Sequence, residues 1–209
     1  MMAGRTIVPL DGVGTGASGG AFLYVFPCAY EDYAKLGISK EPFARLSAFA
    51  PRYFEFFDLE RGWLVRADAV REARQWETRL HRHLHAHAAP PPLLVPRRAA
   101  GHTEWLRGAQ AALEAARDDF IRQGFTVHAS LRAWAQARLS AERWRLATME
   151  QAAVATWGAI EFWPWQVEHT PLAAVRDSLD ACRALEVEFS DVVSAALHDW
   201  HRRSSLLPP

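Results

Sequence analysis

The stretch that decides the fold is Phe22-Leu23-Tyr24-Val25-Phe26, which is followed by Lys35-Leu36-Gly37-Ile38-Ser39. Aromatic and β-branched residues are enriched in strands, so we expect strands over residues 21–27 and 33–38. The five residues between them, 28–32, suit the turn of a hairpin. The first half of the chain is therefore predicted to be built on an antiparallel strand pair.

The segments that follow extend this hairpin. Residues 41–49 are expected to form a short helix that carries proline in its first turn, where proline is tolerated. The aromatic run 53–59 is expected to be a third strand, and 61–66 can extend it. Residues 67–88 contain no glycine or proline and are expected to form a helix. The order β-β-α-β-α predicts an α+β fold with a small three-stranded antiparallel sheet flanked by helices.

After Trp105 the patterns are helical only, which predicts an all-α region over 110–209. One helix is expected to end near Gly124, a second to run from 131 to 160, and a third from 170 to about 201 with heptad-like apolar spacing. The last two would form a long helical hairpin. The glycine-rich residues 1–20 are expected to be a flexible leader, and 21–107 to be the first domain.

Composition limits the classes of protein that fit. The chain has 209 residues, of which half are hydrophobic, and its 24 basic and 24 acidic side chains balance. Residues 1–109 carry 14 Lys/Arg against 11 Asp/Glu, and 110–209 carry 10 against 13. The two cysteines are far apart, and we expect neither a membrane helix nor a signal peptide, so a cytoplasmic location is predicted.

Three later fragments complete a recognisable set: Glu77, Leu80-His81 and Gly101-His102-Thr103-Glu104-Trp105-Leu106. With the strand motifs, in this order and spacing, they resemble the GIY-YIG nuclease family. The similarity is closest to the phage and bacterial branch whose second motif reads Lys-Ile-Gly and whose domain closes on a Glu-Trp-Phe-like triplet. It covers about residues 21–107 and implies metal-dependent hydrolysis of DNA.

The resemblance also implies roles for individual residues. Glu77 would be the catalytic glutamate that binds Mg²⁺ or Mn²⁺, cations that prefer oxygen ligands and keep most of their waters. Tyr24 would position or activate the attacking water. Arg45 would bind the scissile phosphate and stabilise the charge of the transition state. Gly37 would allow a close approach to the sheet.

Further positions of the motifs are assigned less directly. Lys35 and His81 would assist at the catalytic site, and Lys35 and Lys40 would also bind the phosphate backbone of DNA. Glu104 either supports the site or only closes the fold with Trp105. One departure is that the chain contains no asparagine, whereas many GIY-YIG nucleases place one near the site.

Each of these residues also has an ordinary structural interpretation. Glu77 can pair with Arg74 or Arg82 on an exposed helix face. The ring of Tyr24 can simply pack on a strand. A continuous helix through His87 would place Glu77, His81 and His85 on one face, which is an alternative zinc site.

The favoured function is a metal-dependent DNA endonuclease. The first alternative is a non-catalytic DNA-binding module. The second is an interaction or assembly protein that forms a homodimer or binds another protein through its C-terminal helices. In that case Leu172, Leu179 and Val193 would lie on the contact face.

Overall fold

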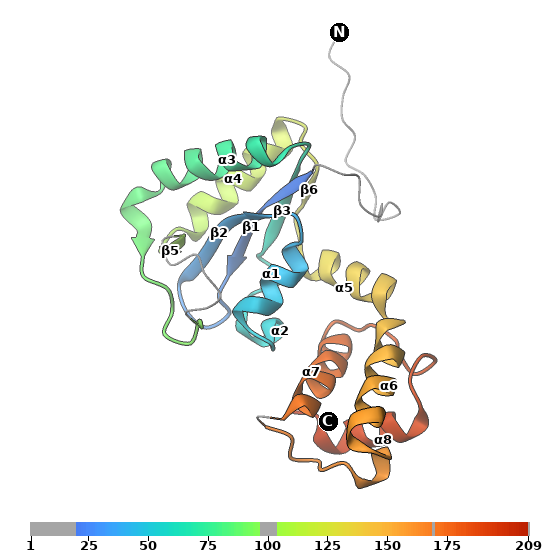
Figure 1. Ribbon diagram of the computed structural model, residues 1–209. Helices are drawn as coiled ribbons and strands as arrows, with labels where there is room; N and C mark the ends of the chain where they lie inside the picture. Colours follow the sequence, from blue (N-terminus) through green and yellow to red (C-terminus); the bar gives the residue numbers. More distant parts are fainter. Residues whose placement is uncertain (1–19, 97–103, 169, 209) are drawn as a thin grey trace. The chain divides into compact units, whose positions relative to one another are not determined.

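The computed structural model describes residues 20–96, 104–168 and 170–208. The chain forms two compact units, residues 1–134 and 135–209 (Figure 1). Residues 1–19 of the predicted leader and the motif residues Gly101, His102 and Thr103 lie outside the described residues.

The first unit contains an antiparallel sheet that has six strands in its described part. The strand order is β4-β5-β2-β1-β3-β6. The strands are β1 (Ala21–Pro27), β2 (Tyr33–Ser39), β3 (Trp63–Ala67), β4 (Ala88–Ala89), β5 (Trp105–Arg107) and β6 (Val127–His128). The prediction of an α+β fold is confirmed, but the prediction of a small three-stranded sheet is wrong.

The three extra strands explain that error. β4, β5 and β6 are two or three residues long, which is too short for an alternating pattern to be recognised in sequence. β5 forms because residues 105–107 pair with the first three residues of β2, and β6 forms because Val127 and His128 pair with β3. These strands depend on a neighbouring strand edge that only the folded sheet provides.

The third strand is also displaced from its predicted position. Residues 53–59 are not a strand, because Tyr53–Phe56 is a short helix, α2. The strand is β3, which overlaps the stretch 61–66 that was expected only to extend it. Tyr53 lies in α2 and is buried, and Phe57, the extended residue that follows the helix, is also buried and forms an isolated β-bridge with Cys28. A dense aromatic run therefore satisfies helical burial as well as strand burial.

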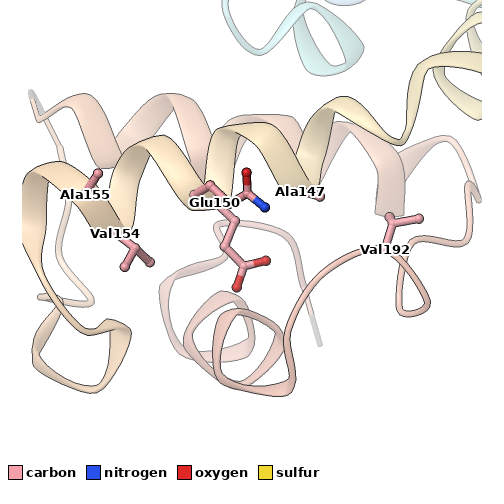
Figure 2. Close-up of a pocket in the computed structure, with 6 residues that line it drawn as sticks. Ala147, Glu150, Val154, Ala155 and Val192 are labelled. Carbon is pink, nitrogen blue, oxygen red and sulfur yellow. The ribbon is translucent and has the colours of Figure 1, made fainter.

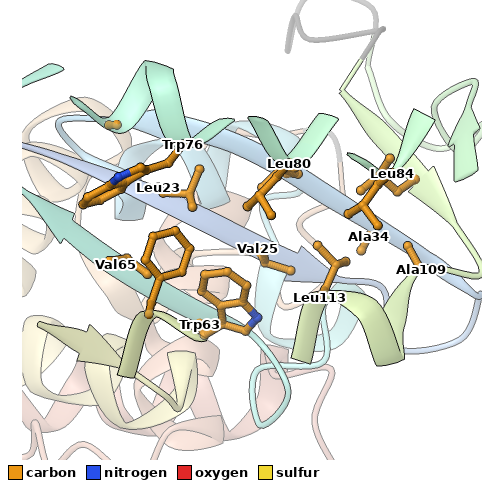
Figure 3. Packing of buried hydrophobic residues seen from close by; sticks show 14 of the residues in the cluster. Leu23, Val25, Ala34, Trp63, Val65, Trp76, Leu80, Leu84, Ala109 and Leu113 are labelled. Carbon is orange, nitrogen blue, oxygen red and sulfur yellow. The ribbon is translucent and has the colours of Figure 1, made fainter. Parts of the chain in front are cut away.

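The two faces of the sheet bury different side chains. One face carries Leu23, Val25 and Leu36, and it packs against α3 (Val70–His83) and α4 (Gln110–Arg122) (Figure 3). The opposite face of β1 and β2 carries Tyr24, Phe26, Lys35 and Gly37. Helix α1 (Pro42–Phe49) packs on it, because its Phe49 ring lies against Trp105 of β5 at 5.8 Å between centroids.

Helix α3 ends earlier than the predicted helix over 67–88. It stops at His83, and a single 3₁₀ turn, η1 (His85–His87), leads into β4. Its apolar face holds Ala73, Trp76 and Leu80, which are buried in the core. Because α3 ends at His83, His85 does not continue the helix face of Glu77 and His81.

The second unit is helical, and its helices are shorter than predicted. α5 (Leu131–Glu142) begins in the first unit and is followed by α6 (Arg145–Trp157), η3 (Ile160–Phe162), α7 (Pro171–Ala184) and α8 (Ala195–Ser204). The helices predicted over 131–160 and 170–201 are thus each interrupted. After α7 the backbone of Glu186 has a φ of 55°, a left-handed conformation that ends a helix.

A buried polar network closes the second unit. Trp200 is fully buried, and its Nε1 donates to the carbonyl of Pro164 at 2.8 Å. Asp180 is also fully buried and bonds with the His201 ring nitrogen Nε2 at 2.8 Å. Within the described ranges, no helix is both long enough and apolar enough to span a membrane.

Candidate functional site

The site is built around Gly37, which faces Tyr24 across the central strand pair. A Cβ atom on Gly37 would lie 2.5 Å from the Tyr24 hydroxyl oxygen and 2.7 Å from its ring Cζ. The phenol therefore occupies the space where any larger side chain would be. The other side of the Tyr24 ring stacks on Phe26, with 4.2 Å between centroids. The Tyr24 ring therefore contacts both the Phe26 ring and the backbone of Gly37.

Arg45 reaches the Tyr24 hydroxyl from α1. Its Nε donates to the hydroxyl oxygen at 3.5 Å, the long limit of a hydrogen bond. The guanidinium lies 4.7 Å from the centroid of Phe49, one turn further along the helix. Such stacking on an aromatic face is favourable for arginine and fixes the guanidinium beside the phenol.

Lys35 and Glu104 form an ion pair behind Tyr24. Lys35 Nζ lies 2.6 Å from Glu104 Oε2, and the lysine side chain is fully buried whereas that of Glu104 is 33% exposed. The ammonium also lies between the rings of Phe49 and Trp105, at 5.7 and 5.6 Å from their centroids. Burial lowers the pKa of Lys35, and the bond to Glu104 opposes that shift. The lysine is thus an internal partner of Glu104.

Glu77 reaches the same place from α3. Its carboxylate is half-buried and makes no hydrogen bond or ion pair with any described residue. Burial raises the pKa of Glu77, the negative charge of Glu104 raises it further, and the charges of Arg74 and Lys35 oppose the shift. The site therefore holds two carboxylates that interact electrostatically, and the Glu77 carboxylate has no hydrogen-bond or ion-pair partner among the described residues.

His81 follows Glu77 by one helical turn. Burial lowers the pKa of His81, while Glu104 and a backbone hydrogen bond at Leu36 oppose the shift. Its Nε2 is buried and has no hydrogen-bond partner among the described residues. The ring is therefore neutral at pH 7 and retains an unused nitrogen, which can act as a donor or an acceptor according to its tautomer.

Tyr24 experiences the same charges. Burial raises the pKa of Tyr24 to about 12, the hydrogen bond and charge of Arg45 lower it, and Glu104 and Glu77 raise it. The phenol is therefore protonated at neutral pH, and its oxygen accepts a hydrogen bond from Arg45. Residues from β1, α1, α3 and the segment before β5 thus act on one another electrostatically, so the structure brings them into one cluster.

The donor set suits a hard cation. Mg²⁺ and Mn²⁺ bind carboxylate oxygen and keep several waters, so a single free carboxylate such as that of Glu77 fits them. No group of three or more His, Cys, Asp or Glu side chains is placed to hold a metal within the described part of the chain. In the alternative zinc cluster, His85 Nδ1 bonds with the Arg82 carbonyl and His87 Nδ1 with the Arg107 carbonyl.

Two further residues named from the sequence, Lys40 and Trp105, lie outside the cluster around Tyr24 or form its wall. Lys40 is exposed between β2 and α1 and makes no hydrogen bond or ion pair with a described residue. Trp105 is fully buried and forms one wall around the Lys35 ammonium. Sequence reasoning missed Phe49, which lies against both Lys35 and Arg45. Its only signal was an apolar position at the end of a short helix, which predicts burial and no more.

Two shallow concave regions lie elsewhere in the described chain. One is a mainly apolar groove along α6 in the second unit, and Figure 2 shows Glu150 and Val154 beside it. The other lies at the β4–β5 edge of the first unit and includes Asp32, His87 and Arg107. Neither is lined by a residue that the sequence assigned to the catalytic site.

Comparison with models of protein families, with curated proteins and with solved structures finds no match for this chain.

Proposed function

We propose that the first unit is a metal-dependent DNA endonuclease that hydrolyses phosphodiester bonds in the manner of GIY-YIG nucleases. The observation that carries this proposal is the cluster around Gly37. Arg45, Glu104 and Glu77 come from three separate segments and all act electrostatically on the phenol of Tyr24. A protonated hydroxyl, a guanidinium and a free carboxylate are the groups that phosphodiester hydrolysis needs.

Tyr24 and Arg45 act on the phosphate and on the attacking water. Because the Tyr24 pKa is raised to about 12, its hydroxyl orients the water as a hydrogen-bond partner and does not act as a free phenolate. Arg45, stacked on Phe49, stabilises the negative charge that develops on the phosphate oxygens. The role of Tyr24 is therefore water positioning.

Glu77 holds Mg²⁺ or Mn²⁺ through its free carboxylate. When bound, the cation supplies Lewis acidity and lowers the pKa of a coordinated water. Burial and Glu104 raise the pKa of Glu77, so the carboxyl group must lose its proton for binding to occur.

Lys35, Glu104 and His81 complete the site. The buried Lys35 ammonium fixes Glu104, and through Glu104 it sets the charge next to Glu77. His81, whose Nε2 has no hydrogen-bond partner among the described residues, would give or accept a proton at the leaving oxygen. Lys40, exposed at the end of β2, contacts the DNA backbone.

The test is nicking of supercoiled plasmid by the full chain with Mg²⁺, with Mn²⁺ and with EDTA. We expect metal-dependent nicking by the wild type and a loss of at least ~100-fold in the Glu77→Gln variant. The matched control is Glu60→Gln, which removes an exposed carboxylate of the same unit and should nick as the wild type does.

The other outcomes separate the alternatives. Nicking that is unchanged in Glu77→Gln overturns the catalytic assignment. Gel-shift binding without nicking by any variant makes the first unit a DNA-binding module. If the wild type neither nicks nor binds DNA, the function is assigned instead to the helical unit, whose α6 exposes Val154 and Trp157.

A further inference from the structure

Helix α3 carries a concentration of positive charge on its exposed side. Its 14 residues include four arginines, Arg71, Arg74, Arg79 and Arg82, and two glutamates. All four arginines are exposed. Glu72 accepts a hydrogen bond from the backbone N–H of Asp68 at 3.0 Å, so its carboxylate is already engaged in capping the helix. Glu77 is therefore the one carboxylate of α3 left to offset the charge of its four arginines.

The arginines of α3 differ from other arginines of the first unit. Arg61 pairs with Glu114 at 3.0 Å, and Arg117 pairs with Asp118 at 2.9 Å. By contrast, the guanidinium groups of α3 form no hydrogen bond or ion pair with a residue in the described ranges. Among these four, only Arg74 has a recorded electrostatic partner, because its charge lowers the pKa of Glu77.

This arrangement works against the stability of the isolated helix. Arg71 and Arg74, and likewise Arg79 and Arg82, are three residues apart, where like charges repel each other. Arg71 also lies in the first turn of α3, next to the positive end of the helix dipole. Arg82, by contrast, lies in the last turn, where a positive charge is favourable. Helix stability therefore does not account for Arg71 and Arg74, whereas an anionic ligand does.

One of the arginines, Arg74, adjoins the candidate site, and two others continue the row around the exposed side of the helix. At about 100° per residue, Arg74 lies beside Glu77 and His81 on the helix surface, and Arg71 and Arg82 follow further from the core. Arg79 lies beyond them, on the other side of the exposed surface. From Arg71 to Arg82 the row spans about 16 Å at the helical rise of ~1.5 Å per residue. That length covers several phosphates of one strand at their axial spacing of ~3.4 Å.

We propose that Arg71, Arg74 and Arg82 form a docking row for the phosphate backbone of duplex DNA, which leads one strand to Glu77. The proposal rests on the proposed function, because the row adjoins the nuclease site. It also explains how a chain with balanced charge binds a polyanion: the positive charge is concentrated on one helix face.

The test measures binding apart from cleavage. A fluorescein-labelled DNA duplex of random sequence is titrated with the full chain in EDTA, with fluorescence anisotropy as the readout, over a range of salt concentrations. The row variant is Arg71→Gln/Arg74→Gln/Arg82→Gln. The control variant, Arg145→Gln/Arg202→Gln/Arg203→Gln, removes the same charge from exposed helix positions of the second unit. Circular dichroism verifies that both variants are folded.

We expect the row variant to bind at least ~10-fold more weakly than the wild type at physiological salt. Its plot of log affinity against log salt should be shallower by about 2.7, the value for three lost phosphate contacts. The control variant should match the wild type in both quantities. Equal affinity and slope for the row variant and the wild type would overturn the proposal, as would an equal loss in the control.

The two experiments can disprove the nuclease proposal and the docking-row proposal independently of each other. If the wild type does not nick plasmid but the row variant still binds more weakly, the nuclease proposal is wrong and the docking row stands. If the wild type nicks plasmid and the row variant binds normally, the nuclease proposal stands and the row is wrong. A wild type that does not bind the duplex overturns the row.

Discussion

The hydroxyl oxygen of Tyr24 lies 2.5 Å from the point where Gly37 would carry a Cβ atom. Tyr24 and Gly37 are directly paired across β1 and β2, so the ring crosses the neighbouring strand at its one position without a side chain. This contact turns the phenol toward Arg45. The glycine of the second motif thus determines where the hydroxyl of the first motif lies.

Gly37→Ala is expected to displace the Tyr24 ring and to destabilise the first unit by about 1–3 kcal/mol, the usual cost of overpacking a core. Urea denaturation measures the change. Tyr24→Ala removes the obstructing ring, so the double variant Gly37→Ala/Tyr24→Ala should lose less stability than the sum of the two single losses. Strict additivity would show that the two residues are not in contact.

Glu104→Gln is expected to lower the free energy of unfolding by about 1–3 kcal/mol, because the buried ammonium of Lys35 loses its carboxylate partner. The shift of the urea midpoint checks this. Lys35→Met/Glu104→Gln removes both charges and should recover most of the loss, since an apolar side chain of similar volume suits the pocket between Phe49 and Trp105. A Glu104→Gln variant as stable as the wild type would contradict the ion pair.

Tyr24 should make the folded state less stable in strong alkali. The unfolded tyrosine loses its proton near pH 10, whereas the folded one keeps it until about pH 12, so folding is progressively opposed as pH rises between these values. The free energy of unfolding of the wild type, relative to that of Tyr24→Phe, should therefore fall by about 2–3 kcal/mol across this range. Denaturation at a series of alkaline pH values measures it. A difference independent of pH would mean that the pKa of Tyr24 is not raised.

Cleavage should be lost on acidification at a higher pH than an ordinary glutamate would give. Because the Glu77 pKa is raised, first by burial and then by Glu104, its carboxyl group gains a proton, and releases metal, earlier as pH falls. Glu104→Gln removes one of these causes, so the acidic limb of its pH–rate profile should move to lower pH. An unmoved limb would show that the two carboxylates do not interact.

Asp180→Asn should destabilise the helical unit by about 2–4 kcal/mol. The buried carboxylate bonds with the His201 ring at 2.8 Å and accepts from the Ser205 hydroxyl at 2.6 Å and from the Leu206 amide at 3.3 Å. Thermal unfolding followed by circular dichroism gives the measurement. Asp199→Asn removes an exposed carboxylate paired with Arg202 and should change stability by less than about 0.5 kcal/mol. Equal effects in both variants would exclude a structural role for the network.

The local sequence pattern was sufficient to predict secondary structure where a residue's conformation depends mainly on its neighbours in sequence. The aromatic and aliphatic residues of β1 and β2 predicted both strands almost to the residue, whereas the group that lies against Gly37 is the side chain of Tyr24. The helix around 113–121 was also found, with its end near Gly124, whose positive φ of 80° suits glycine.

The local sequence pattern gave a wrong prediction where the same residue types suit both a strand and a helix. The aromatic run 53–59 has strand propensity, yet its first four residues form the helical turn α2, and Phe57 after it makes an isolated β-bridge with Cys28. Only the folded backbone shows that the helix predicted over 170–201 is interrupted after Ala184, where Glu186 has a positive φ.

The sequence by itself determined the α+β class, the central hairpin and the residue types available for chemistry, because these follow from side-chain periodicity and from the motifs. The tertiary structure decided the six-stranded sheet and the state of each charged group. Lys35 looked like a surface ligand for phosphate, yet it is fully buried and bonds with Glu104, 69 positions away in sequence. Burial and long-range pairing set the pKa of a side chain, and neither is a property of its sequence neighbours.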